Sequence, residues 1–278
     1  MIKQYYRLSR PINALAGCVA VFLSAYVADA VSWWPIILAA VTVLLITIST
    51  NAWNDYLDIE IDRINKPERP LPAGLISPRG ALIFSIVGFA LSLVTAAFIN
   101  LPAFLIALGS NILLYFYSRK LKCTVLFGNA AVASIIALCF IFGGVAAENV
   151  PPTIMLAVTV FFAIMGREIL KTMADHRGDL QQNCGTIATV WGKKTAGVLV
   201  KIFIGITAAA MLLTHFSERY NPVYLVIVIV VIFPLLTYIA LNARHNADSR
   251  TLERNSTFMK YGFFIWFIAV ALGAGLNV

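Results

Sequence analysis

The chain has 278 residues, of which 60% are hydrophobic and only 12% are charged. A soluble domain carries about 25% charged residues, so this composition excludes an ordinary soluble protein and indicates one whose main solvent is lipid. The net charge is +8, but no soluble basic face accompanies it. This pattern excludes a nucleic-acid-binding protein and favours contact with anionic lipid or phosphate.

Nine apolar runs follow one another along the chain, each about 20 residues long and therefore able to cross a bilayer core as a helix. They cover residues 12–31, 35–57, 80–99, 101–118, 124–147, 152–171, 195–215, 222–242 and 260–277. No polar connection between them is long enough to fold separately. We therefore predict a single domain over residues 1–278. Its fold class is an all-α membrane protein with nine transmembrane helices in a bundle around a central cavity.

The positive charges indicate how this bundle is oriented. If the N-terminus is cytoplasmic, 20 of the 21 Lys and Arg residues fall on the cytoplasmic side, and only Arg219 falls outside. The positive-inside rule therefore predicts that the N-terminus is cytoplasmic. We expect the protein in the cytoplasmic (plasma) membrane, with its active site facing the cytoplasm. The first run ends in the signal-peptidase-like sequence Ala28-Asp29-Ala30, but it is long for a signal peptide. Cleavage there would leave the other loops on the same sides.

The four cysteines give no pattern of a metal or disulfide site. Cys18 and Cys139 lie in predicted helices, and Cys123 and Cys184 in predicted cytoplasmic loops. None belongs to a CxxC pair, so we predict neither a zinc site nor a disulfide framework. We interpret all four as small apolar side chains.

An acidic stretch directly follows the second apolar run: NAWNDYLDIEIDRINKPERP, residues 51–70. Asn54, Asp58 and Asp62 are four residues apart, so in a continuous helix they share one face. Asp55 and Glu60 then point elsewhere. A loop rich in proline and glycine follows at 63–80.

A second acidic stretch, REILKTMADHRGD at 167–179, ends the sixth run. Arg167, Lys171, Asp175 and Asp179 repeat the four-residue step, and a glycine-containing loop follows at 176–194. The two loops lie four helices apart, so both helix ends point the same way. This arrangement hints at a parallel internal repeat.

Charged side chains at membrane depth are costly and usually line a functional site, although single charges at helix ends are often merely solvated. Four carboxylates converging without cations would repel one another. Carboxylate oxygens suit Mg²⁺, which binds one or two carboxylates together with water and phosphate oxygens. The two motifs therefore predict a diphosphate bridged through Mg²⁺ to both acidic clusters. Because apolar walls would accept a long apolar tail, the predicted ligand is a polyprenyl diphosphate.

Four stretches together resemble the UbiA superfamily of membrane prenyltransferases. Residues 54–74 resemble its first signature, NxxxDxxxD followed by a proline-rich loop, and residues 167–179 resemble its second, DxxxD. YSRKLKCTVLFGN at 117–129 and SRPINALAG at 9–17 resemble two further stretches of the family. The resemblance implies a nine-helix fold and Mg²⁺-dependent prenyl transfer.

Within the superfamily, the second motif resembles the pattern RExxKDxxDxxGD of the digeranylgeranylglyceryl phosphate synthases of ether-lipid synthesis. It departs from that pattern at Thr172, where an Asp is usual, and so lacks one carboxylate. The resemblance implies transfer from geranylgeranyl diphosphate to geranylgeranylglyceryl phosphate. It implies no protein partner beyond the substrates and the membrane lipid.

The resemblance also implies roles for individual residues. The expected catalytic residues are Asp58, Asp62, Asp175 and Asp179, which together with Asn54 are expected to hold Mg²⁺. The expected substrate-binding residues are Asn13, Asn54, Arg63, Arg69, Lys122, Arg167 and Lys171.

One alternative within the family remains open at this point, and two from other classes are disfavoured. An aromatic- or quinone-prenylating or chlorophyll-type UbiA enzyme fits the first motif equally well. A CDP-alcohol phosphotransferase needs an Asp-Gly step near its acids, and the chain has none. An ion-coupled membrane transporter should carry its acids near the bilayer midplane beside broken helices, whereas these acids lie at one interface.

Overall fold

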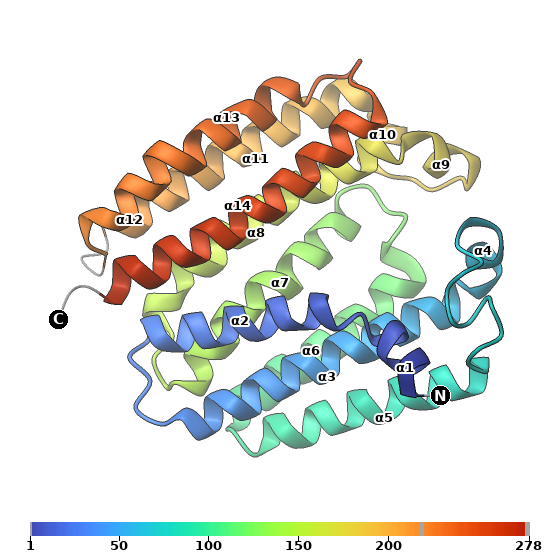
Figure 1. The fold of residues 1–278 in the computed structure, drawn as a ribbon, viewed down its shortest axis with the longest axis horizontal. Coiled ribbons are helices and arrows are strands. Elements are labelled where there is room, and N and C mark those ends of the chain that lie inside the picture. The colour runs from blue at the N-terminus through green and yellow to red at the C-terminus, as the bar shows by residue number, and fades with distance from the viewer. Residues whose placement is uncertain (1, 217–219, 276–278) are drawn as a thin grey trace. The chain divides into compact units, whose positions relative to one another are not determined.

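The computed structural model describes residues 2–216 and 220–275, and within these ranges it contains helices and connections but no β-strand (Figure 1). The side chains of residues 12, 13, 65 and 275 lie outside this description, and with them the predicted substrate-binding side chain of Asn13. The prediction of an all-α protein is confirmed.

The described residues divide into two compact units. Unit 1 covers Met1–Lys120 and Ile141–Pro151, and unit 2 covers Leu121–Phe140 and Pro152–Val278. The helices up to the unit boundary are α1 (Ile2–Ser9), α2 (Pro11–Val27), α3 (Trp33–Leu57), α4 (Ile59–Asn65), α5 (Pro78–Ala97), α6 (Leu101–Phe116) and the π-helix η1 (Tyr117–Leu121). Helix α7 (Phe127–Ala146) begins in unit 2 and ends in unit 1.

The remaining helices belong to unit 2, except for Pro151, the first residue of α8. They are α8 (Pro151–Ala174), α9 (His176–Gln181), α10 (Ile187–Val190), α11 (Gly192–His215), α12 (Pro222–Ile227), the π-helix η2 (Val228–Ile232), α13 (Phe233–Asn242) and α14 (Ser249–Gly275).

Eight helical segments of the described residues are long and apolar enough to cross a bilayer. They are Trp33–Leu57, Pro78–Ala97, Leu101–Leu121, Phe127–Ala146, Pro151–Ala174, Gly192–His215, Pro222–Asn242 and Ser249–Ala274. Helices α1 and α2 would form a ninth span, bent by 59°. The bend lies at Arg10, whose φ of 47° is left-handed, directly before Pro11, which lacks an amide hydrogen for the preceding turn. The count of nine and the cytoplasmic N-terminus stay predictions.

In unit 1, α3 packs against both α2 and α5. A Cβ on Gly88 of α5 would lie 2.0 Å from the hydroxyl oxygen of Ser49 on α3, so the close approach of these helices needs a glycine. A buried apolar cluster joins α1, the end of α3, the proline-rich loop and the start of α5. Its members are Leu8, Ala52, Leu71, Ile76 and Ala81. This cluster fixes the loop directly after the first acidic motif.

In unit 2, α14 packs against α12 and α13, and α11 packs against α13. A Cβ on Gly197 of α11 would lie 2.7 Å from the carbonyl oxygen of Ala243, so this contact also needs a glycine. At its start, α14 reaches the second acidic motif, because the hydroxyl of Ser249 donates to the carbonyl of Ala174 at 2.9 Å. The end of α8 is thereby anchored directly before Asp175.

Candidate active site

The first acidic motif lies at a break between a long helix and a short one. Helix α3 ends at Leu57, Asp58 adopts φ −93° and ψ 9°, and α4 starts at Ile59. The backbone bonds nevertheless continue, from the Asp58 amide to Asn54 at 2.9 Å and from the Asp62 amide to Asp58 at 2.8 Å. The spacing of Asn54, Asp58 and Asp62 predicts one continuous helix, whereas in the structure the helix is interrupted at Asp58.

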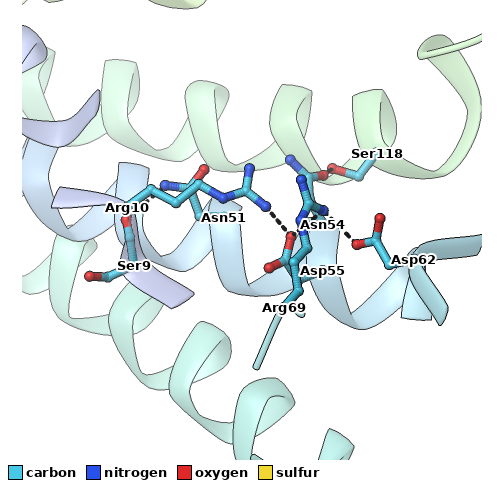
Figure 2. A network of polar contacts seen from close by, with 8 residues as sticks. All are labelled: Ser9, Arg10, Asn51, Asn54, Asp55, Asp62, Arg69 and Ser118. Carbon is cyan, nitrogen blue, oxygen red and sulfur yellow. Dashed lines mark hydrogen bonds and ion pairs between the residues drawn. The ribbon is translucent and has the colours of Figure 1, made fainter. Parts of the chain in front are cut away.

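Asp55 is the centre of a buried ion-pair network in this motif (Figure 2). Its side chain is 3% exposed, and one of its carboxylate oxygens pairs with both Arg10 and Arg69, the latter at 3.2 Å. Arg69 also pairs with Asp62 at 2.5 Å, so one guanidinium joins Asp55 to Asp62. The prediction that Asp55 points away from the other acids of the motif is therefore wrong.

This network follows from the cost of burying a carboxylate without a cation. The planar guanidinium of Arg69 has several donors and can serve two acids at once. Arg10 reaches Asp55 from the break between α1 and α2, where the Asn51 side-chain amide also donates to the carbonyl of Ser9 at 2.8 Å. The N-terminal helices are thus tied to the acidic end of α3.

The other predicted residues of this motif have identified partners. The carboxamide oxygen of Asn54 accepts a hydrogen bond from the hydroxyl of Ser118 (Figure 2). Arg63 pairs with Glu60 at 2.8 Å, with both side chains more than half exposed, so this is a surface pair. In the structure, Arg69 contacts carboxylates and Arg63 lies on the surface.

The second acidic motif repeats the backbone of the first. Helix α8 ends at Ala174, Asp175 adopts φ −82° and ψ 1°, and α9 starts at His176. The Asp175 amide donates to Lys171 at 2.8 Å, and the Asp179 amide donates to Asp175 at 3.0 Å. Here too, an aspartate stands at the junction of a long and a short helix, with a second aspartate in the first turn after it.

Asp179 lies in a half-buried position in unit 2. Burial raises the pKa of its carboxyl above the usual value, and the hydrogen bond from Thr186 opposes that rise. The neighbouring charge of Asp175 raises this pKa further, while the charges of His176 and Lys122 lower it. Of the predicted residues in unit 2, Lys122 and Asp175 thus lie within range of electrostatic interaction with Asp179.

The two predicted cations of α8 share a buried acid that the sequence analysis did not select. Glu168, with a side chain 10% exposed, pairs with Arg167 at 2.8 Å and with Lys171 at 2.9 Å. The signal for the second pair was the i, i+3 spacing on one helix. In the structure, Arg167 and Lys171 therefore neutralise Glu168.

Cys123 and Cys184 form a disulfide, so the prediction of no disulfide is wrong, as is the interpretation of these two residues as small apolar side chains. Their Cα atoms are 4.7 Å apart although the two residues are 61 positions apart in the chain. The bond joins the loop before α7 to the loop after α9. No signal in a single sequence reveals such a pairing, because cysteine spacing alone does not give connectivity.

The donor atoms fit Mg²⁺ bound jointly with a phosphate ligand. Among the described residues, no group of three or more His, Cys, Asp or Glu side chains could hold a metal ion. Mg²⁺ typically takes only one or two carboxylates and completes its shell with water and substrate phosphates. The carboxylates of each motif therefore suit a Mg²⁺ ion that is also coordinated by the phosphate oxygens of a diphosphate. They do not suit a metal ion coordinated by protein side chains alone.

Comparisons with known proteins agree with the two motifs. Residues 14–268 match the model of the UbiA prenyltransferase family. The digeranylgeranylglyceryl phosphate synthase of Methanosphaera stadtmanae is 34% identical, over 97% of this chain and 98% of that protein. That of Sulfolobus acidocaldarius is 36% identical, over 91% and 92% of the two chains.

Solved structures show the same fold. A structure of digeranylgeranylglyceryl phosphate synthase superposes with a TM-score of 0.85, at 29% identity and 98% coverage of both chains. A UbiA homologue from Archaeoglobus fulgidus bound to GPP and Mg²⁺ gives 0.74 at 23% identity, covering 95% of this chain and 99% of its own. By its sequence and its fold, this chain belongs to the UbiA prenyltransferase family.

Proposed function

We propose that this protein transfers a geranylgeranyl group from geranylgeranyl diphosphate to the free hydroxyl of geranylgeranylglyceryl phosphate, a step of ether-lipid synthesis. The observation that carries the proposal is similarity along nearly the whole chain to the digeranylgeranylglyceryl phosphate synthases of several archaea, at 31% to 36% identity. The second acidic motif, which distinguishes subgroups of the family, supports the same choice. An aromatic or quinone acceptor remains the alternative outcome of the test below.

The aspartates of both motifs bind the diphosphate end of the donor. We assign metal binding to Asn54, Asp58, Asp62, Asp175 and Asp179. Magnesium, when bound there, neutralises the departing diphosphate and so favours cleavage of the bond between the donor's first carbon and its oxygen. The acceptor oxygen then bonds to that carbon and loses its proton.

The basic residues bind the remaining phosphate oxygens. We assign this role to Arg63, Arg69, Lys122, Arg167 and Lys171. To Asn13 we assign contact with the head of the acceptor. Arg69 and Lys171 already pair with carboxylates. Because a diphosphate oxygen competes for the same N–H donors, these two side chains exchange or share partners when the substrate binds.

The surrounding protein keeps water from the reaction. An allylic cation reacts with water, so a chamber lined by apolar helices favours transfer over hydrolysis. The protein is integral to the membrane, as its apolar spans require. From its charge distribution we assign it to the cytoplasmic membrane, with the acidic motifs facing the cytoplasm. We assign the whole of residues 1–278 to one prenyltransferase domain.

The test is a comparison of acceptors. Purified protein in detergent is incubated with Mg²⁺, geranylgeranyl diphosphate and one acceptor at a time: geranylgeranylglyceryl phosphate, the same ether without phosphate, an aromatic acid, or a quinol precursor. We expect product from the glyceryl phosphate and none without Mg²⁺. Transfer to the aromatic acid or the quinol precursor, but not to the glyceryl phosphate, would contradict the proposed acceptor. Transfer to none of them would contradict prenyl transfer itself.

A further inference from the structure

A closed circuit of contacts surrounds Asp179 in unit 2. The Cys184 amide donates to the carbonyl of Asp179 at 2.8 Å, and the side chain of Thr186 hydrogen-bonds to its carboxylate. Cys184 is bonded to Cys123, and the preceding residue, Lys122, places its charge near the Asp179 carboxylate. The disulfide therefore closes the path from Lys122 back to Asp179.

The loop that carries Lys122 is held on its α7 side by backbone and side-chain contacts. The amide and hydroxyl of Thr124 donate to the carbonyl of Leu121 at 3.0 and 2.6 Å. A Cβ on Gly128 would lie 2.5 Å from that same oxygen, so the start of α7 packs tightly on this turn. On the α9 side, the disulfide is the covalent link to this loop, and the backbone of Gly185 lies against the Cys123 carbonyl.

We propose that Cys123 and Cys184 form a redox-sensitive clamp that positions Lys122 beside Asp179 for binding of the donor diphosphate. This proposal rests on the proposed function, because it assigns the loop to the diphosphate site. Both cysteines are positioning residues, and they act through Lys122.

The exposure of Cys123 favours exchange of the disulfide with a thiol. Cys123 is exposed, whereas Cys184 is only 8% exposed. An incoming thiolate therefore meets the sulfur of Cys123 first. On the cytoplasmic side that the charge distribution predicts, thiols are usually kept reduced, and disulfides there are typically transient or redox-sensing.

Reduction of the Cys123–Cys184 disulfide requires a dithiol. One thiolate of the dithiol attacks the Cys123 sulfur, the S–S bond breaks, and Cys184 leaves as a thiolate that takes up a proton. The second thiol of the dithiol then displaces Cys123, which also becomes a thiol. The protein gains two electrons and two protons, and the dithiol becomes a disulfide.

The first measurement counts thiols in the full-length protein, purified without reductant. Denatured protein is alkylated either before or after treatment with dithiothreitol. Mass spectrometry of the intact protein then gives the number of alkylated cysteines. We expect two alkylated cysteines before reduction, Cys18 and Cys139, whose sulfur atoms are not in a disulfide bond, and four after it. Four alkylated cysteines in the untreated protein would overturn the clamp.

The second measurement is the Kd of geranylgeranyl diphosphate with Mg²⁺, by calorimetry, so that no acceptor is involved. We expect dithiothreitol to weaken binding about tenfold, the size expected for one lost contact to a charged group. Cys123→Ser and Cys184→Ser should bind as weakly and no longer respond to dithiothreitol. The double variant Cys18→Ala/Cys139→Ala is the matched control and should bind and respond like the wild type.

The variant Lys122→Ala separates positioning from general stability. If the clamp acts through Lys122, this variant should bind about tenfold more weakly, and adding Cys123→Ser should weaken binding little further, because the two changes remove the same contact. A Cys123→Ser protein with a lower Tm but an unchanged Kd would reduce the disulfide to a structural brace and overturn the proposal. Failure of the oxidised wild type to bind the donor would instead contradict the proposed function, and with it the role given to the clamp.

Discussion

The two acidic motifs have the same backbone but different electrostatic surroundings. Asp58 and Asp175 each stand between a long and a short helix, with φ and ψ differing by about 11° and 8°. In each motif, the amide of this aspartate bonds to the residue four before it, and the next aspartate bonds back to it. The weak internal repeat suggested by the sequence thus has a counterpart in local geometry.

The surroundings differ in how negative charge is balanced. In the first motif, Arg10 and Arg69 pair directly with Asp55 and Asp62. In the second, the cations of α8 pair with Glu168, and Asp179 has a hydroxyl partner and the more distant charges of its neighbours. The comparison teaches that arginines pair directly with buried acids in the first motif, whereas a hydroxyl and the charges of His176 and Lys122 act on Asp179 in the second.

The largest effect should come from removing the aspartate at either junction. If the common backbone reflects a common role in metal binding, Asp58→Ala and Asp175→Ala should each lower turnover about 10³-fold, since such groups stabilise charge that develops on the leaving diphosphate. Activity is measured with saturating Mg²⁺, and the Tm in detergent reports folding. Glu60→Ala is the control, because Glu60 is exposed and pairs with Arg63 on the surface. Near-normal turnover in one junction variant would mean that the two motifs do not share this role.

A second test addresses charge balance in the first motif. Asp55→Ala leaves Arg10 without its buried acid and Arg69 with Asp62 alone. Removing one partner of a buried pair typically costs about 3 kcal/mol or more of unfolding free energy. Glu60→Ala breaks an exposed pair and should cost below about 1 kcal/mol. Unfolding in detergent by denaturant measures both values. Equal costs for the two variants would refute the view that this motif is stabilised by its own ion pairs.

The two motifs also show which features of the protein its sequence could predict and which it could not. Hydropathy predicted the membrane class, because a lipid solvent demands long apolar runs, and motif spacing located both acidic regions. Periodicity could not predict the breaks at Asp58 and Asp175, since the backbone bonds continue through each. The partners of Asp55 and the disulfide depend on how distant loops fold back, and a single sequence carries no signal for such contacts.

A third prediction uses the raised pKa of Asp179, which has no direct arginine partner. In metal-free protein, the protonated carboxyl is favoured in the fold, so its contribution to the free energy of unfolding is present below the unfolded pKa. That contribution is lost as pH rises through the higher folded pKa. Asp179→Asn should abolish this part of the pH dependence, and Thr186→Val should move it to higher pH by removing the opposing hydrogen bond. Denaturation in detergent at a series of pH values, with a chelator present, measures it.

Magnesium should act against this protonation. A metal ligand must be deprotonated, so adding Mg²⁺ with diphosphate should shift the transition of Asp179 to lower pH. Asp179→Asn is the control, because it lacks the carboxyl and should show no such shift. An equal shift in the wild type and in this variant would mean that another group binds the proton that Mg²⁺ displaces.

The smallest effect concerns the anchor of the second junction. The Ser249 hydroxyl donates to the carbonyl of Ala174 at 2.9 Å, at the last residue before Asp175. Ser249→Ala should cost about 1 kcal/mol of unfolding free energy, as for one ordinary hydrogen bond. Asp248→Ala is the control at the adjacent position: it removes the acceptor of the Thr251 amide at the start of α14 but leaves the bond to Ala174 in place. If the anchor orients Asp175, only Ser249→Ala should also weaken binding of the prenyl diphosphate with Mg²⁺. Equal binding by the two variants would mean that the backbone of the second motif keeps its geometry without this anchor.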